Sequence, residues 1–267
     1  MAEETSSGPG EQAARRPPKR RTRGHISLSL RLAVAAIYPA TLVMYRIRYR
    51  HGGRIPATGP VLLVANHVSV LDPLSCARLA WDHGRAPHFL IKKAVFTGAV
   101  GPILRRAGQI PVSRDASDAT GSLTAARADL EAGNLVVVYP EGTVTRDENW
   151  WPMEGATGVA RLALTSDAVV VPVAQWGPQR VHDYHAKKLH LRFRAPADYL
   201  VGEPVDLAGV RAEVAAGRPL TRELLRETTD LIMGRVRDQL AELRGEPAPA
   251  GFVRRPARKV AGPGSAA

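Results

Sequence analysis

Cysteine is almost absent from this sequence of 267 residues, since Cys76 is the only one. No disulfide can form within the chain, and a scaffold held together by disulfides is therefore excluded. Aromatic residues make up 5% of the sequence, which leaves few side chains on which nucleic-acid bases could stack. For that reason nucleic acid is not an expected partner.

The N-terminal region has no apolar run long enough to predict a membrane-spanning helix. Its longest uncharged apolar run, residues 32–45, has 14 residues and contains Pro39, whereas a spanning helix needs about 20. An arginine stands at every second position from 46 to 50, and such cations suit a surface of anionic lipid headgroups. We predict a membrane-associated helical segment over residues 25–50; the alternative is a core helix with a solvated basic edge.

The charge balance is strongly positive. Lys and Arg number 37 against 25 Asp and Glu, which gives a formal net charge of +12. This excess predicts an anionic partner, such as a phosphorylated substrate or an acidic lipid surface. Residues 1–24 and 246–267 are rich in Pro, Gly, Ala and Arg and predict disordered tails. Between the N-terminal segment and the second tail we predict one folded domain, residues 51–245.

Strand-like and helix-like segments alternate within this domain. Short continuous apolar runs predict buried strands, and apolar residues at helical spacing predict helices. Strands are predicted over 60–66, 87–93, 109–114, 134–142 and 168–176, an edge strand over 187–196, and helices over 73–81, 99–108, 117–133, 157–167 and 221–244. The alternation predicts an α/β fold with a mixed, largely parallel sheet flanked by helices, in which ligands bind outside the carboxyl ends of the strands.

A histidine and an aspartate stand five residues apart just after the first of these strands. His67 would emerge at the carboxyl end of the strand, and Asp72 would be the N-cap of the next helix. A carboxylate that accepts the Nδ1 proton would orient the imidazole and leave Nε2 to take a proton from a hydroxyl. Spacing alone leaves open that Asp72 only caps its helix and that His67 is an ordinary loop residue.

A second polar cluster follows the strand predicted over 134–142. Glu141 and Gly142 stand at its exit, and Thr143 and Arg146 come soon after. A glycine allows backbone N–H groups to approach an anion, and a threonine adds a hydroxyl donor. These residues predict an anion-binding turn, although an ordinary turn has the same composition.

Two further cations are candidates for phosphate binding. Lys92 and Arg114 stand near the ends of the strands predicted over 87–93 and 109–114. A guanidinium binds a phosphate through two parallel hydrogen bonds, and an ammonium adds a point charge. The alternative is that both are solvated surface cations.

In this order and spacing, four segments of residues 25–200 resemble the sequence blocks of the glycerolipid acyltransferase family, of the 1-acyl-sn-glycerol-3-phosphate acyltransferase type. They are NHVSVLD (66–72), GQIPVSR (108–114), YPEGT (139–143) and VVPVA (170–174). One departure concerns the third block, since the family usually has an arginine directly after its threonine. Here Val144 stands in that position, and Arg146 is the nearest cation after it.

The resemblance implies a mechanism in which His67 deprotonates the free hydroxyl of a lysophospholipid and Asp72 holds the imidazole. The expected reaction converts lysophosphatidic acid to phosphatidic acid, with acyl-CoA or acyl carrier protein as the acyl donor. The resemblance implies neither a metal nor another cofactor, and it implies work at the cytoplasmic face of the cell membrane. The residues expected to bind the acceptor are Lys92, Arg114, Glu141, Gly142, Thr143 and Arg146.

Other acceptors and two other functions remain open at this point. Glycerol 3-phosphate or another lyso-lipid could replace lysophosphatidic acid. In a thioesterase, His67 would activate water in place of an alcohol. In a non-catalytic module, the basic residues would bind anionic lipid or nucleic acid, and deletion of residues 1–24 would then abolish function.

Overall fold

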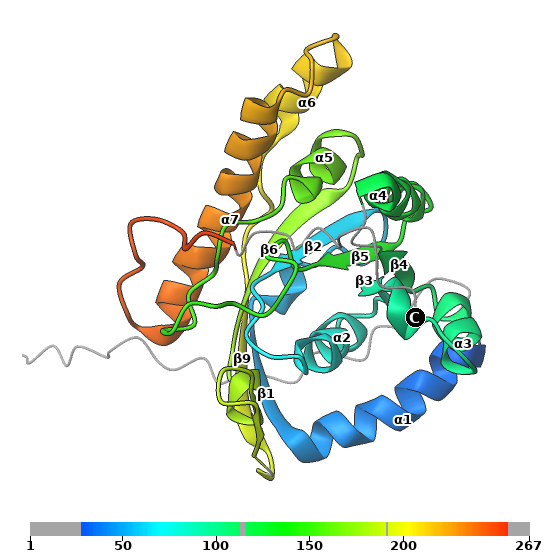
Figure 1. Ribbon diagram of the computed structural model, residues 1–267, viewed down its shortest axis with the longest axis vertical. Coiled ribbons are helices and arrows are strands. Elements are labelled where there is room, and N and C mark those ends of the chain that lie inside the picture. Colours follow the sequence, from blue (N-terminus) through cyan, green and yellow to red (C-terminus); the bar gives the residue numbers. More distant parts are fainter. Residues whose placement is uncertain (1–27, 113–115, 191, 256–267) are drawn as a thin grey trace, which may run out of the picture.

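The computed structural model describes residues 28–112, 116–190 and 192–255. These residues form a seven-stranded sheet with helices on both faces (Figure 1). Its strands, in spatial order, are β1 (Tyr45–Arg50), β9 (Ala195–Val201), β6 (Val169–Trp176), β2 (Val61–Ala65), β5 (Leu135–Val138), β3 (Pro87–Lys92) and β4 (Ile110–Val112). The helices are α1 (Leu28–Met44), α2 (Asp72–Asp82), α3 (Val100–Arg106), α4 (Ala116–Glu131), α5 (Gly158–Leu164), α6 (Ala208–Ala215) and α7 (Arg222–Arg244).

The sheet is mixed but largely parallel. Strands β6, β2, β5, β3 and β4 run parallel to one another, whereas β9 is antiparallel to β6 and β1 is parallel to β9. The predicted fold class is therefore confirmed. Helices connect the parallel strands because two parallel neighbours need a crossover connection.

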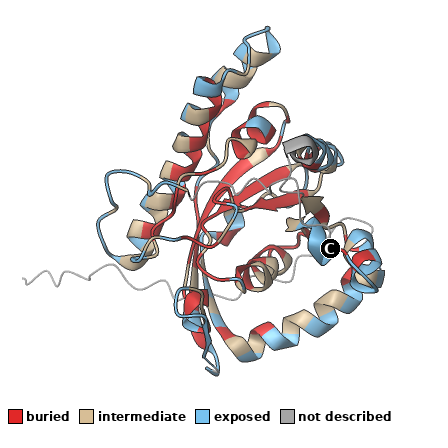
Figure 2. Ribbon diagram, viewed as in Figure 1, coloured by how far each residue is buried: buried red, intermediate tan, exposed pale blue. Residues whose placement is uncertain are grey.

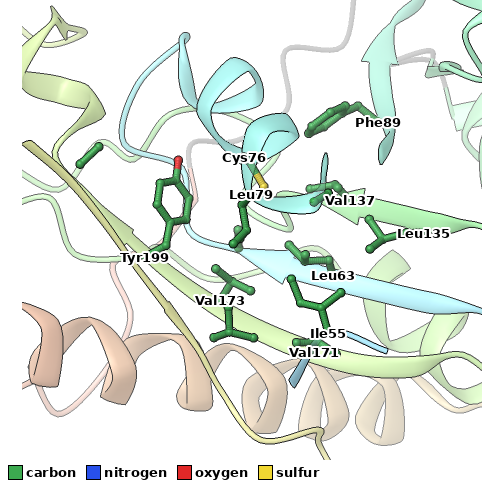
Figure 3. Packing of buried hydrophobic residues seen from close by; sticks show 14 of the residues in the cluster. Ile55, Leu63, Cys76, Leu79, Phe89, Leu135, Val137, Val171, Val173 and Tyr199 are labelled. Carbon is green, nitrogen blue, oxygen red and sulfur yellow. The ribbon is translucent and has the colours of Figure 1, made fainter. Parts of the chain in front are cut away.

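The central strand β2 is covered on both faces, which explains its unbroken apolar sequence. All five of its residues are fully buried. Leu63 packs with Val137, Cys76 and Leu79 on the face that α2 covers (Figure 3). Alternate residues of β2 pack on the other face against α4, α5 and α7. Figure 2 shows the resulting buried sheet between two helical layers.

The register of β2 and β5 fixes where the polar loops lie. Val64 lies opposite Val138 in this parallel pair, so both strands end at nearly the same level. The loops that begin at Asn66 and Tyr139 therefore leave the same edge of the sheet, side by side. This is the edge at which α/β sheets bind their ligands.

The N-terminal segment differs in part from its prediction. Residues 28–44 form α1, but Tyr45–Arg50 form the edge strand β1 and not more helix. The alternate arginines of β1 project from a strand, and Arg48 donates to Asp198 of the neighbouring β9 at 2.7 Å through one guanidinium nitrogen. Among the described residues no helix combines the length and apolar character that crossing a bilayer requires.

Helix α1 is fixed to the domain along one side. The Tyr38 hydroxyl donates to Asp82 of α2 at 2.7 Å, and the Arg78 guanidinium lies 5.2 Å from the Tyr38 ring centroid. Along the rest of the helix, Leu28, Leu32 and Val43 have 71%, 63% and 56% of their surface exposed. One side of α1 thus packs on the domain, while apolar side chains elsewhere on it face outward.

The predicted edge strand over 187–196 is wrong. Lys188–Leu189 forms β8, which pairs antiparallel with β7 (His182–Asp183) in a separate two-stranded hairpin. The backbone is left-handed at Arg194, with φ 52°, and β9 begins only at the next residue. The alternating sequence pattern therefore reflects an exposed hairpin followed by an interior strand.

The predicted tail over 246–267 is ordered up to Arg255. Helix α7 ends at Gly245, whose φ of 68° is the left-handed conformation of a helix C-cap. Val253 then forms a bridge with Met153, and the Arg237 guanidinium lies 5.2 Å from the Phe252 ring centroid. The predicted tail over 1–24 and the end of the second tail, 256–267, lie outside the described residues.

Candidate active site

His67 and Asp72 lie in direct contact at the carboxyl edge of the sheet. His67 is the second residue after β2, and Asp72 is the first residue of α2. The His67 Nδ1 atom lies 2.8 Å from Asp72 Oδ2. The same oxygen accepts hydrogen bonds from the amides of Val68 and Ser69, at 2.6 and 2.9 Å. The prediction that Asp72 is the N-cap is wrong, because its carboxylate binds groups that precede the helix.

The Asp72 carboxylate is completely buried. Burial raises the pKa of Asp72 above its ordinary value, and the hydrogen bonds from the His67 ring and two backbone amides oppose that shift. Its second oxygen, Oδ1, has no hydrogen-bond partner among the described residues. The carboxylate therefore binds the His67 imidazole and two amides of the same loop, and it is shielded from solvent.

The imidazole of His67 is held on one face and open at one atom. The Tyr139 ring stacks on it with 4.4 Å between centroids and 21° between planes. The exposed fraction of the His67 side chain is 16%. Nδ1 binds Asp72, and no described residue bonds to Nε2. This geometry leaves Nε2 available to exchange a proton with a bound molecule.

The Glu141 carboxylate accepts hydrogen bonds from backbone amides on both sides of the site. Its Oε1 accepts from the His67 amide at 2.8 Å, and its Oε2 accepts from the Met153 amide at 3.0 Å. The residue is 2% exposed, and burial raises the pKa of its carboxyl to about 8. With both oxygens engaged, Glu141 positions the His67 loop against the loop that follows β5.

Replacing Glu141 by Gln should destabilise the protein in a pH-dependent way. The Gln amide group would face one of the two backbone donors, and a buried unpaired donor costs about 1–3 kcal/mol. Wild-type stability should fall as pH rises from the ordinary carboxyl pKa toward about 8, because the folded state holds the Glu141 proton more tightly. Glu141→Gln lacks this titration. In urea unfolding, its deficit should therefore be largest at acidic pH and smaller at pH above 8; a deficit that grows with pH would contradict this assignment.

The turn after Glu141 is glycine-dependent and partly open. Gly142 has a φ of 70°, a left-handed conformation that favours glycine, and its amide donates to the Tyr139 carbonyl at 2.9 Å. Thr143 is half-buried next to it. The loop returns to the site at Thr145, whose amide donates to the His67 carbonyl at 2.8 Å. The structure thus brings Gly142 and Thr143 to the same edge as His67.

The structure describes two of the three cations that were predicted to bind the acceptor, and it places them differently. Arg146 is exposed and lies against Tyr184, with 3.2 Å between its guanidinium and the hydroxyl. Lys92 is exposed at the end of β3, opposite Val112 of β4. Arg114, two residues beyond β4, lies outside the described residues. Lys92 therefore stands at the His67 edge, whereas Arg146 turns toward the hairpin.

Sequence reasoning missed a buried polar network behind His67. The side-chain oxygen of Asn66 accepts from the Gln175 amide at 2.8 Å, and its side-chain nitrogen donates to the Gln175 carbonyl at 3.1 Å. The Tyr199 hydroxyl lies 2.9 Å from the Gln175 side-chain oxygen and 2.6 Å from Ser75 Oγ. The asparagine directly before His67 was the available signal. This network ties β2, β6 and β9 at the level of the site.

Comparison with known proteins finds similarity to acyltransferases. A family model described as Acyltransferase matches residues 46–176. The 1-acyl-sn-glycerol-3-phosphate acyltransferase alpha of Mus musculus is 26% identical over 167 residues, which are 62% of this chain and 56% of that protein. The beta enzyme of Homo sapiens is 28% identical over 130 residues, 48% of this chain and 45% of that protein. The chain thus spans about half the length of these curated relatives.

A solved structure matches over a larger share of the chain. The crystal structure of the 1-acyl-sn-glycerophosphate (LPA) acyltransferase PlsC from Thermotoga maritima superposes with a TM-score of 0.58 at 21% identity and covers 82% of this chain and 81% of that one. This similarity establishes the shared fold. His67, Asp72 and Glu141 all fall within the residues that the family model matches. Residues 46–176 thus match a family model described as Acyltransferase, and both curated relatives that the chain resembles are 1-acyl-sn-glycerol-3-phosphate acyltransferases.

Proposed function

We propose that this protein transfers a fatty acyl group from a thioester to the free hydroxyl of a lysophospholipid, with lysophosphatidic acid as the acceptor and phosphatidic acid as the product. The observation that carries the proposal is the His67–Asp72 contact of 2.8 Å, which leaves Nε2 unbonded within the described residues. An imidazole arranged in this way is a general base for a hydroxyl. The names of the matched relatives support this class of acceptor.

In the proposed reaction His67 Nε2 takes the proton of the acceptor hydroxyl while the oxygen attacks the thioester carbonyl. The carbon–sulfur bond then breaks, an ester bond has formed, and the departing thiolate receives the proton from His67. No side chain carries the acyl group at any stage. The ionised Asp72 stabilises the imidazolium that exists between the two proton transfers.

Neighbouring residues keep the imidazole in this orientation. Tyr139 stacks on the ring, and Glu141 fixes the His67 amide from below. Both act on the acceptor only through His67, so we assign them as positioning residues. For Glu141 this replaces the direct acceptor contact that its motif implied, since both of its oxygens already bind backbone amides.

We assign recognition of the acceptor's phosphate to Lys92, at the same edge of the sheet, and to Arg114, which lies outside the described residues. Lys92 ends β3, and Arg114 follows β4, which pairs with β3 up to Val112. The Thr143 hydroxyl, in the turn after Glu141, adds a further donor. Arg146 lies against Tyr184 and would have to turn away from it to reach a phosphate next to His67.

The acyl donor is proposed to be acyl-CoA or acyl carrier protein, and the site of action the cytoplasmic face of the cell membrane. Both lipid substrates of such a reaction partition into bilayers. The exposed apolar residues of α1 supply a surface with which the protein could approach them, namely Leu28, Leu32 and Val43.

An acyl transfer assay with one long-chain acyl-CoA and a panel of acceptors tests the proposal. The panel contains lysophosphatidic acid, glycerol 3-phosphate and lysophosphatidylcholine. We expect acylated lysophosphatidic acid as the main product, with little free fatty acid. Free fatty acid in every reaction would identify a thioesterase, and the absence of any turnover with either CoA or carrier-protein donors would overturn an enzymatic function.

A further inference from the structure

The β7–β8 hairpin borders the candidate active site. Ser69 Oγ, in the loop that carries His67, donates to the His182 carbonyl at 3.0 Å. His185 Nε2 lies 2.9 Å from the carbonyl of Thr145, whose amide binds the His67 carbonyl. The hairpin is thus tied to the loops that form the site, at His182 in β7 and at His185 in its turn.

The turn of the hairpin, β8 and the residues between β8 and β9 combine exposed cations with exposed apolar side chains. Phe193 and Leu189 have 76% and 59% of their surface exposed. From residue 184 to residue 194 the sequence contains no acidic residue. The exposed cations of this segment are Lys187, Lys188, Arg192 and Arg194. Exposed apolar side chains grouped with cations in one segment are typical of a surface that binds a partner.

This surface continues onto helix α1. The Arg194 amide donates to the carbonyl of Val43 near the end of α1 at 2.8 Å, and Val43 itself is 56% exposed. Figure 1 shows the yellow-green hairpin next to β1, at the same end of the molecule as α1, and Figure 2 shows exposed residues on both. Two segments far apart in the sequence therefore present apolar and basic side chains side by side.

We propose that residues 187–190 and 192–194, in β8 and on either side of it, dock on a bilayer of anionic lipid together with α1. Phe193 and Leu189 would enter the headgroup region, while the neighbouring lysines and arginines would contact lipid phosphates. Exposed apolar side chains favour a lipid surface over an acidic protein, because charge complementarity alone does not require them. The proposal rests on the proposed function only for its purpose, which is to bring a membrane-bound acceptor to His67.

Vesicle binding tests the docking surface without reference to catalysis. The experiment uses the full chain carrying His67→Ala and vesicles of phosphatidylcholine with or without phosphatidylglycerol. In this background, Phe193→Ala should weaken binding to anionic vesicles about tenfold. The double substitution Lys187→Gln and Lys188→Gln should weaken it about tenfold at low salt, with a smaller effect as salt rises.

Matched controls come from the opposite end of the molecule. Leu231→Ala removes an apolar side chain of α7 that is 45% exposed, and the pair Arg161→Gln and Arg222→Gln removes two exposed cations from α5 and α7. These controls should bind vesicles as the parent does. Equal losses in the controls and the hairpin variants would show that only total charge or hydrophobicity matters, and would overturn a localised docking surface.

A reporter variant gives a second, independent readout. Phe193→Trp keeps a large aromatic side chain, and tryptophan favours the membrane interface. Its emission, compared with that of the parent, should shift to shorter wavelength on addition of anionic vesicles and should be quenched by brominated lipid. An unchanged emission, or a shift produced equally well by acyl carrier protein without lipid, would overturn the proposal.

The two proposals fail in distinguishable ways. If the hairpin docks on lipid but the protein lacks acyltransferase activity, the vesicle experiments succeed and the acceptor panel gives no ester. If the enzyme is active but the hairpin does not dock, Phe193→Ala should acylate both kinds of acceptor as fast as the parent does. One acceptor is bound to vesicles, and the other is a short-chain acceptor dissolved as monomers. We expect instead that Phe193→Ala loses turnover about tenfold only with the vesicle-bound acceptor.

Discussion

Replacing His67 by Ala should lower the rate of acyl transfer by about a hundredfold to ten-thousandfold, the usual contribution of a general base. Ala cannot take the proton of the acceptor hydroxyl, whereas the acceptor and the thioester would still bind. The loss should therefore appear in kcat more than in KM. Initial rates with acyl-CoA and lysophosphatidic acid measure it, and far-UV circular dichroism shows whether the variant is folded.

A second histidine–aspartate pair provides a matched control. His88 Nδ1 lies 2.7 Å from Asp129 Oδ2, with both side chains largely buried. This pair has the same contact as His67 and Asp72 but lies near the amino end of β3, away from the edge where the polar loops gather. His88→Ala should lower stability and leave kcat near the wild-type value. A His67→Ala variant that retains activity within a few-fold of wild type would refute the assignment of the base.

Replacing Asp72 by Asn should separate activity from stability. Asn can still accept from the His67 ring and from the two loop amides, so the geometry of the site should persist. It carries no charge and cannot stabilise the imidazolium, and the rate should fall by about a hundredfold to ten-thousandfold. The same measurement of kcat applies, with Asp129→Asn as the control.

The stability of Asp72→Asn should change in the opposite direction. Burial raises the pKa of Asp72 in the folded protein, so the folded state binds that proton more tightly than the unfolded chain. Wild-type stability should therefore fall as pH rises from the unfolded pKa, about 3.9, through the folded value. The variant lacks this loss, and its melting temperature relative to wild type should rise across that range and then level off. A melting temperature that falls relative to wild type with increasing pH would contradict this account.

The edge of the sheet that holds the candidate site was predictable because it depends on local patterns. Continuous apolar runs marked β2 and β5, and the parallel order of such strands placed their exits together. The contact between His67 and Asp72 spans only five residues, and the strand–loop–helix order limits how far apart the two can lie. Short separation in the sequence made this contact accessible to reasoning from spacing.

Long-range partners were not predictable from spacing. Glu141 binds the His67 amide across 74 residues, and nothing in its motif indicates that both of its oxygens are occupied. The network of Asn66 and Gln175 spans 109 residues. Such pairings depend on register between strands, which a single sequence does not specify.

Two local errors had a different cause. The alternation in YRIRYR, residues 45–50, is a strand pattern, but its position directly after an apolar helical run favoured a continued helix. The alternation over 187–196 predicts one strand, although a left-handed residue, Arg194, divides it. Period-two patterns on exposed segments indicate extended backbone and do not identify the partner strand.

The placement of β1 bears on the order in which the protein can assemble during synthesis. β1 lies at the sheet edge and pairs with β9, and Tyr45 meets Ala195 only after 150 further residues have been made. Until then β1, the first strand within the described residues, has no neighbour in this sheet, and α1 precedes it with its apolar residues uncovered. A nascent chain would thus have the opportunity to reach a bilayer before its catalytic domain closes, since contacts of such long separation form late.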